Sequence, residues 1–223
     1  MTDDKAGKGK LPDVLNVRGL GAKWDYVRGL EQRSDPESLA LLVECLCDES
    51  WYLRDLAEEA FMRMAERGAP GLLPLLEQGL WFTRTSAARV LGRLGYRPAV
   101  PALMRLADDL NATVAAAARD AIVAIAREKG VVAVAHGVHR APPDLRRRRL
   151  DDLGARDRAL MERVERLMHN DELMSLEHVA TLADDDDLVR ASEDGVEWEL
   201  LTGSSPATSP PGLAGGGHGD RPA

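Results

Sequence analysis

The strongest constraint on the fold of this chain is an internal repeat: residues 48–126 contain almost three copies of one sequence unit. The start Trp51-Tyr52-Leu53-Arg54 returns thirty residues later as Trp81-Phe82-Thr83-Arg84, and the same frame then carries Ala112-Thr113-Val114-Ala115. The apolar positions behind each start recur as well, in three columns: Ala57, Ala87 and Ala118; Phe61, Leu91 and Ile122; Met64, Leu94 and Ile125. A fixed period near 30 residues predicts a repeat protein in which each unit packs on its neighbours.

The apolar residues within each copy are spaced for helices. In residues 51–66 they follow one another at steps of three and one, which places them on one helical face, and charged residues occupy the other face. Gly and Pro residues follow the first helix of each of the first two copies and end it. The repeats therefore predict paired helices over 51–66 and 71–78, 82–94 and 100–109, and 112–127 and 130–139.

A looser copy of the repeat precedes these pairs. Its start is Trp24-Asp25-Tyr26, and a short helix to Arg33 is expected, followed by a helix over 36–47. Asp35 can cap that second helix, and Pro36 suits its first turn. Small side chains in the column of Ala57, Ala87 and Ala118 would let helices of neighbouring repeats approach closely. A bulky residue at Ala87 should cost about 1–3 kcal/mol by overpacking.

The two ends of the chain differ from the repeat region, residues 23–140. Residues 1–22 are polar and contain several glycines, so they are expected to form a flexible arm. Residues 141–202 are predicted to form a charged helical cap, with helices over 144–153, 156–169 and 171–183 and an interruption of the first near Gly154. Residues 203–223 are rich in Gly, Pro and Ser and are expected to be disordered.

The repeated residues resemble HEAT repeats of the short subtype first named from phycobilisome lyases. The resemblance rests on the acidic turn Asp48-Glu49 and on the apolar-arginine pair Leu53-Arg54. The second copy keeps Arg84 but has Thr83 at the apolar position, and the third has Val114 followed by Ala115 instead of arginine. The resemblance covers residues 24–140 and implies an all-α fold, a right-handed α-solenoid of stacked antiparallel helix pairs with a C-terminal helical segment. HEAT proteins serve mainly as scaffolds and adaptors with unrelated partners, so the resemblance names no partner.

Aromatic residues gather at the repeat starts, where six of the nine in the chain lie. Leu53 is the inward position of its helix, so Trp51 and Tyr52 cannot both share its direction. Some of these rings should therefore reach the surface, where aromatic side chains commonly anchor partners. The predicted docking residues for a partner protein are Trp24, Trp51, Tyr52, Trp81, Phe82 and Arg84. The alternative is that the rings pack on one another between repeats and under the N-terminal arm.

A basic cluster lies just beyond the repeats and consists of Arg140, Arg146, Arg147, Arg148 and Arg149. It could contact phosphate or an acidic protein surface. The alternative is a solvated helix face that is balanced by nearby aspartates. The formal net charge of −8 weighs against broad nucleic-acid binding. The acidic run 184–187 could meet these arginines within the molecule, and it lacks the glycine and the spaced ligands of a calcium loop.

Catalytic, metal and cofactor signals are weak. No nucleophile motif or phosphate-binding glycine loop is present in the sequence, so we predict neither an enzyme nor a bound cofactor. His136 and His139 lie one helical turn apart, but no third ligand is evident, so a surface pair and no metal site are predicted. No histidine is followed by glutamate, which separates the chain from the iron-dependent hydroxylases built on HEAT-like repeats.

The remaining features bear on the cellular compartment. Cys45 and Cys47 point apart on a helix, so they are expected to be buried free thiols, which suits a cytosolic protein. Neither a signal peptide nor a membrane span is evident, and we expect a cytoplasmic protein.

Together these features predict a non-enzymatic protein-interaction module. The alternatives are a cofactor-handling enzyme similar to bilin lyases, and nucleic-acid binding through Arg146–Arg149. The sequence indicates neither the partner nor the oligomeric state.

Overall fold

The computed structural model of the protein describes residues 19–33 and 35–175, and this part of the chain is helical without strands. Its α-helices are α2 (Leu20–Arg33), α3 (Pro36–Leu46), α4 (Trp51–Met64), α5 (Leu73–Glu77), α6 (Trp81–Arg93), α7 (Val100–Leu106), α8 (Ala112–Glu128), α9 (Val131–His139), α10 (Pro143–Arg156), α11 (Arg158–Met168) and α12 (Asp171–Ser175). Short 3-10 turns lie at Ala65–Arg67, Ala69–Leu72 and Arg97–Ala99. The all-α class is therefore confirmed. The bulk of the predicted N-terminal arm, the end of the helix predicted over 171–183, the acidic run 184–187 and the tail 203–223 lie outside the described residues.

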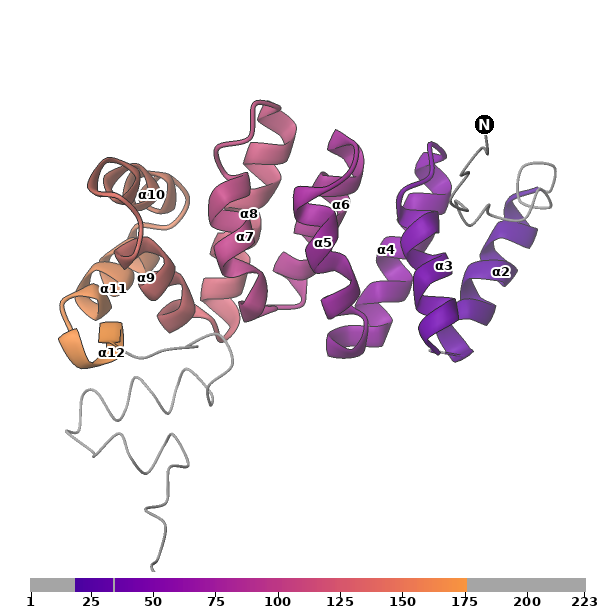
Figure 1. Ribbon diagram of the computed structural model, residues 1–223, viewed down its shortest axis with the longest axis horizontal. Coiled ribbons are helices and arrows are strands. Elements are labelled where there is room, and N and C mark those ends of the chain that lie inside the picture. The colour runs from indigo at the N-terminus through magenta and orange to yellow at the C-terminus, as the bar shows by residue number, and fades with distance from the viewer. Residues whose placement is uncertain (1–18, 34, 176–223) are drawn as a thin grey trace, which may run out of the picture.

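The helices form two layers, and the pairs lie side by side in one row (Figure 1). The first helices α2, α4, α6 and α8 pack on one another in sequence order. The second helices do the same, from α3 through the turn before α5 to α7 and α9, and each of α3, α5 and α7 also packs on the first helix that follows it. Residues 51–80 and 81–111 therefore occupy equivalent places in the row. The hand of any superhelix stays a prediction.

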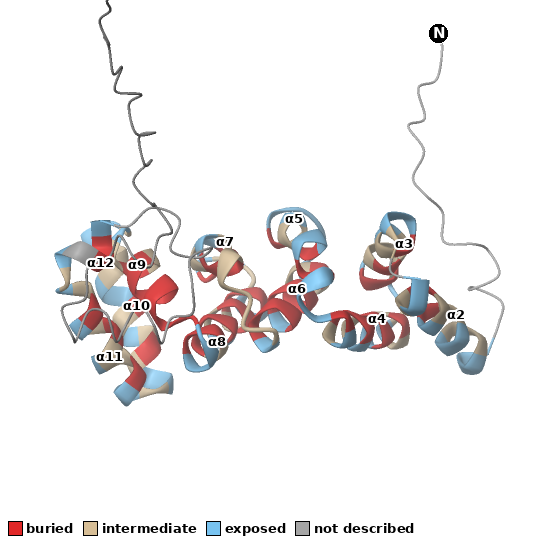
Figure 2. Ribbon diagram, turned by 90° about the horizontal axis from the view of Figure 1, so that it is seen from below, coloured by how far each residue is buried: buried red, intermediate tan, exposed pale blue. Residues whose placement is uncertain are grey.

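The core lies between the two layers, where buried faces of both layers meet (Figure 2). Ala57, Ala87 and Ala118, the column of small residues, are fully buried. The columns behind them are buried as well, with the exception of Leu94, which is half-buried where α6 ends. The periodicity thus identified the core correctly.

Helix ends follow local chemistry. Asp35 caps α3, and its carboxylate accepts hydrogen bonds from the backbone N–H and the hydroxyl of Ser38, both at 2.8 Å, as the sequence predicted. The second helices are shorter than expected, since α5 spans only residues 73–77 and α7 only residues 100–106. A proline explains the late start of α5, because Pro70 lies in the 3-10 turn that precedes it. Helix α7 begins at residue 100 as predicted and is shorter because it ends at Leu106.

Two glycines allow unusually close helix packing. Gly92 of α6 faces Ala121 of α8, and a Cβ atom on Gly92 would lie 2.6 Å from the Ala121 Cα. Gly154 lies against Met161 of α11, whose sulfur would be 2.8 Å from an added Cβ. The prediction that Gly154 interrupts its helix is wrong, because α10 runs through it to Arg156 and uses the missing side chain for packing.

Candidate functional site

One edge of the molecule carries exposed apolar side chains. Because the helix pairs are antiparallel, the first helices run in the same direction and begin along the same edge (Figure 1). Trp51 and Trp81 open α4 and α6, and Trp24 lies in the second turn of α2. Their exposed fractions are 71%, 49% and 43%, respectively. The tryptophans predicted for docking are therefore on the surface.

Three leucines that the sequence reasoning missed extend this edge. Leu20 begins α2, Leu80 directly precedes α6, and Leu110 lies in the turn before α8. With the three tryptophans they make up all the large apolar side chains that are exposed in the described part of the chain. We call these six residues the apolar edge. The signal that could have found the leucines is their position, because each stands at, or one to two residues before, the start of a first helix.

The other two aromatic residues of the predicted ladder support the tryptophans. Tyr52 stacks edge-to-face on Trp51 and Phe82 on Trp81, each with ring centroids 5.8 Å apart. Tyr52 and Phe82 are half-buried. The guanidinium of Arg54 lies 4.5 Å from the Phe82 ring centroid and so links α4 to α6 by a cation–π contact. Rings thus pack in pairs within one repeat, and the tryptophan of each pair remains accessible.

Arg84, the sixth predicted docking residue, is tied into the fold. Its guanidinium donates to the backbone carbonyl of Gly79 at 3.1 Å and pairs with Asp109, at 3.0 Å, in the turn before α8. Arg54 behaves similarly in the preceding repeat, where it donates to the carbonyls of Asp48 and Glu49 at 2.8 and 2.9 Å. These arginines hold the turns between repeats. Partner contact by Arg84 stays a prediction.

A cavity of about 290 Å³ lies between the two aromatic pairs. Its walls include Trp51, Trp81 and Phe82, together with polar side chains that include Glu58 and Arg89. Glu58 and Arg89 also line a larger cleft of about 610 Å³ over α6 and α8. The two hollows therefore meet at these two residues.

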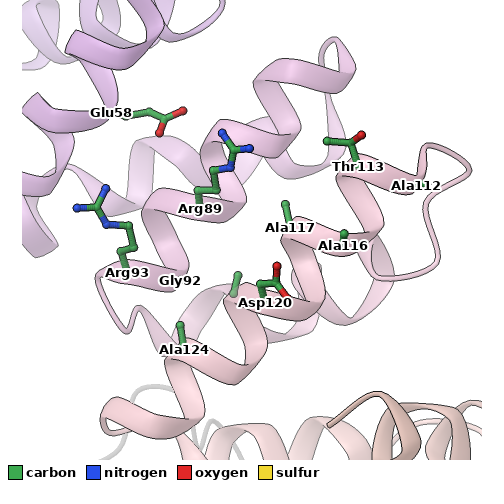
Figure 3. Close-up of a pocket in the computed structure, with 11 residues that line it drawn as sticks. Glu58, Arg89, Gly92, Arg93, Ala112, Thr113, Ala116, Ala117, Asp120 and Ala124 are labelled. Carbon is green, nitrogen blue, oxygen red and sulfur yellow. The ribbon is translucent and has the colours of Figure 1, made fainter. Parts of the chain in front are cut away.

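Figure 3 shows the larger cleft. Arg89 and Arg93 extend from α6 on the side of Glu58, and α8 contributes Thr113, Asp120 and several alanines. Asp120 is paired with Arg156 at 2.7 Å, whereas Arg89 and Arg93 take part in none of the ion pairs formed within residues 19–33 and 35–175. The sequence did contain a signal for this cleft, because Arg89 and Arg93 lie four residues apart and therefore on the same face of the helix.

The basic cluster does not form one surface. Arg149 is buried, with its guanidinium bound to the Asp108 carboxylate and donating to the Met104 carbonyl at 2.9 Å. Arg146 donates to the carbonyl of His139 at 2.6 Å, at the end of α9. Arg148 is exposed but pairs with Asp108 at 3.3 Å. Arg140 and Arg147 are exposed. Two of the five arginines thus support the packing of α10, and anion contact by the cluster stays a prediction.

A third cavity, of about 520 Å³, lies where α7, α9 and the start of α10 meet. It is the place that brings Arg140 and Arg149 together, along with Arg105 and His136. The prediction of a surface histidine pair is wrong for His136, which is buried, because α9 is apolar on almost every side and packs against α7, α8 and α11. His139 is half-buried.

The two cysteines differ in their exposure to solvent. Cys45 is buried, as predicted, and this burial raises the pKa of its thiol to about 12. The prediction of a buried thiol is wrong for Cys47, which is exposed because α3 ends before it. Within residues 19–33 and 35–175, no group of three or more His, Cys, Asp or Glu residues is placed to hold a metal ion. None of the helices in the described part is long and apolar enough to cross a membrane.

These features define the class of protein as a helical repeat protein. A family model described as the PBS lyase HEAT-like repeat matches residues 83–109, which cover most of α6, the following 3-10 turn and α7. The predicted resemblance is thereby confirmed: the chain carries a HEAT-like repeat of the phycobilisome-lyase type, and the match falls on the second copy. A search of curated proteins finds no significant match to the chain.

Proposed function

We propose that this protein is a HEAT-type solenoid that docks a partner protein on its apolar edge. The observation that carries the proposal is that the exposed large apolar side chains of residues 19–33 and 35–175 all stand at or close to the starts of the first helices, and that Trp51 and Trp81 line one cavity there. Scattered single apolar residues are normal on a protein surface, whereas a contiguous apolar group is typical of an interaction site. Tryptophan is also the residue type most enriched among interface residues that dominate binding energy.

The cavity between the two aromatic pairs supports the same proposal. It lies directly beside Trp51 and Trp81, and its polar lining residues can orient a partner side chain that enters between them. Truncating one such interface tryptophan typically costs at least about 2 kcal/mol, or roughly a thirtyfold loss of affinity. Because Trp51 is 71% and Trp81 49% exposed and neither belongs to the buried core, their removal should leave the helical core intact.

The experiment uses the full chain with a photocrosslinking phenylalanine analogue in place of Trp51, and a second chain with the analogue in place of Arg147 as the control. The partner is the protein that crosslinks at the first position and not at the second. Its dissociation constant is then measured with Trp51→Ala/Trp81→Ala and with Arg147→Ala. We expect the double variant to lose at least about thirtyfold in affinity and the control to be unchanged. Equal crosslinking at both positions, or a folded double variant that binds as wild type does, would refute docking at the apolar edge.

We also propose that the protein acts without catalysis. Two alternative functions are each open to a separate test. A cofactor-handling activity similar to bilin lyases would be supported by a chromophore that copurifies with the protein. Nucleic-acid binding through the basic cluster predicts salt-sensitive binding of labelled DNA or RNA. If none occurs at low ionic strength, that alternative is removed.

A further inference from the structure

The cavity between α7, α9 and α10 has a structural origin that is separate from the apolar edge. Up to α9 the helix pairs follow one another in a regular row. Helix α10, which begins at Pro143, runs in a different direction from α8, the preceding first helix (Figure 1). The hollow of about 520 Å³ remains at this change of direction. Its volume lies within the range of roughly 300–1,000 Å³ that is usual for small-molecule sites.

The cavity has an apolar interior. Met104 and Val100 of α7 form one wall, Ala133 and Gly137 of α9 form another, and Leu145 of α10 adds a further apolar side chain. Gly137 keeps α7 and α9 close, because a Cβ atom there would lie 3.2 Å from the Val100 side chain. An apolar wall of this kind favours the hydrocarbon part of a ligand.

The charges around the cavity are predominantly positive. Arg105, Arg140 and Arg149 line it together with a single carboxylate, that of Asp108. Arg105 is bound to Glu77, and Arg149 is bound to Asp108 and lies 3.5 Å from Asp152. Arg140 is exposed and takes part in none of the ion pairs formed within the described residues. One uncompensated guanidinium therefore stands beside an apolar hollow.

We propose that this cavity binds a small amphipathic carboxylic acid, with the carboxylate on Arg140 and the apolar body against Met104 and Leu145. Arginine matches a carboxylate through two parallel hydrogen bonds, which makes it well suited to hold this head group. A single unpaired cation fits a single negative charge, and the Asp108 carboxylate disfavours a more highly charged head group such as a phosphate. Medium-chain fatty acids and aromatic acids share this chemistry.

Methyl resonances of the methionines provide a direct test on the full chain. Decanoate and decanol, which has the same chain length without the charge, are titrated into protein labelled at its methionine methyl groups. We expect the Met104 signal, assigned with Met104→Leu, to shift and saturate with decanoate, while that of Met62 on α4 stays in place. Decanol should bind at least about tenfold more weakly, since it cannot form the charge-assisted pair.

Matched variants locate the head group. Arg140→Gln should weaken decanoate about tenfold and leave decanol unchanged, because only the charged pair is lost. Arg147→Gln makes the same change of charge on an arginine that does not line the cavity, and it should have no effect. The half-buried Ala141 lines the cavity, so Ala141→Leu should reduce the binding of both ligands. Circular dichroism confirms that each variant is folded.

Three results would overturn the proposal. The first is a Met104 shift that does not saturate, and the second is equal binding of decanoate and decanol. The third is an equal loss of decanoate affinity in Arg140→Gln and Arg147→Gln, which would indicate general electrostatic attraction. None of these outcomes bears on the apolar edge, which lies at the starts of other helices.

Discussion

The contact between Gly92 and Ala121 leads to a prediction with an unusual sign. Replacing glycine by alanine inside a helix normally stabilises the helix by about 1 kcal/mol. At Gly92 the new Cβ atom would lie 2.6 Å from the Cα and 2.7 Å from the Cβ of Ala121. Neither atom can rotate away, so α6 and α8 would have to separate along the most extensive helix contact of the described chain.

The magnitude follows from the difference between these two effects. Overpacking costs about 1–3 kcal/mol, and we take the upper end because the obstructing atoms include the backbone. After subtraction of the gain in helix propensity, Gly92→Ala should lower the free energy of unfolding by about 2 kcal/mol. Gly29 of α2 provides the matched control, since nothing lies within 4 Å of an added Cβ there. Gly29→Ala should instead raise the free energy of unfolding by up to about 1 kcal/mol.

Urea unfolding followed by far-UV circular dichroism measures both variants, with the slope of the transition checked against that of the wild-type protein. Hydrogen exchange should also be faster in α6 and α8 of Gly92→Ala than in α3. If Gly92→Ala unfolds at the same or a higher urea concentration with an unchanged slope, the close approach of α6 and α8 is not a constraint and the reasoning is refuted.

Three further predictions concern single side chains. Arg149→Ala should destabilise the protein by about 1–3 kcal/mol in urea unfolding, because it removes a buried side chain together with its ion pair to Asp108 and its hydrogen bond to the Met104 carbonyl, whereas Arg147→Ala should change stability by less than about 0.5 kcal/mol. Hydrogen bonds to the carboxylate of Asp35 lower its pKa below 3.8, so its stabilising effect is present above that pH and is lost as the pH falls through the lowered pKa. Asp35→Asn should therefore keep the cap but flatten the acid side of a plot of melting temperature against pH. In native protein at pH 8, iodoacetamide should label Cys47 and spare Cys45, which mass spectrometry can check; labelling of both thiols before unfolding would contradict the burial of Cys45.

The repeat and the core could be predicted from the sequence because both depend on the spacing of residues within short segments. A period near 30 residues gives the helix pairs, and apolar steps of three and four give the inward faces. The cap at Asp35 needs only the residues of one turn. The direction of Leu53, which is fully buried, also predicted that Trp51 and Tyr52 could not both face inward, and Trp51 is the exposed one of the two.

The features that the sequence did not predict depend on how separate helices meet. Consecutive arginines such as Arg146 to Arg149 look like one basic surface, yet a helix distributes them around its circumference, and Arg149 ends beneath α10 on Asp108. Gly154 looks like a break until α11 is placed against it. The cavity beside Arg140 exists only because α10 changes direction after α9, and no local pattern records that angle.

The uneven contacts along the row of first helices have a mechanical consequence. α6 packs far more extensively on α8 than on α4, and the hollow beside Trp51 and Trp81 lies at the looser of these two junctions. Bending of the molecule should therefore concentrate between α4 and α6, with the segment from α6 to α9 moving as a stiff body. Trp51 and Trp81 stand on opposite sides of this hinge, so bending changes the distance between the two rings. A partner that binds both rings at once would therefore restrict the movement of α4 relative to α6.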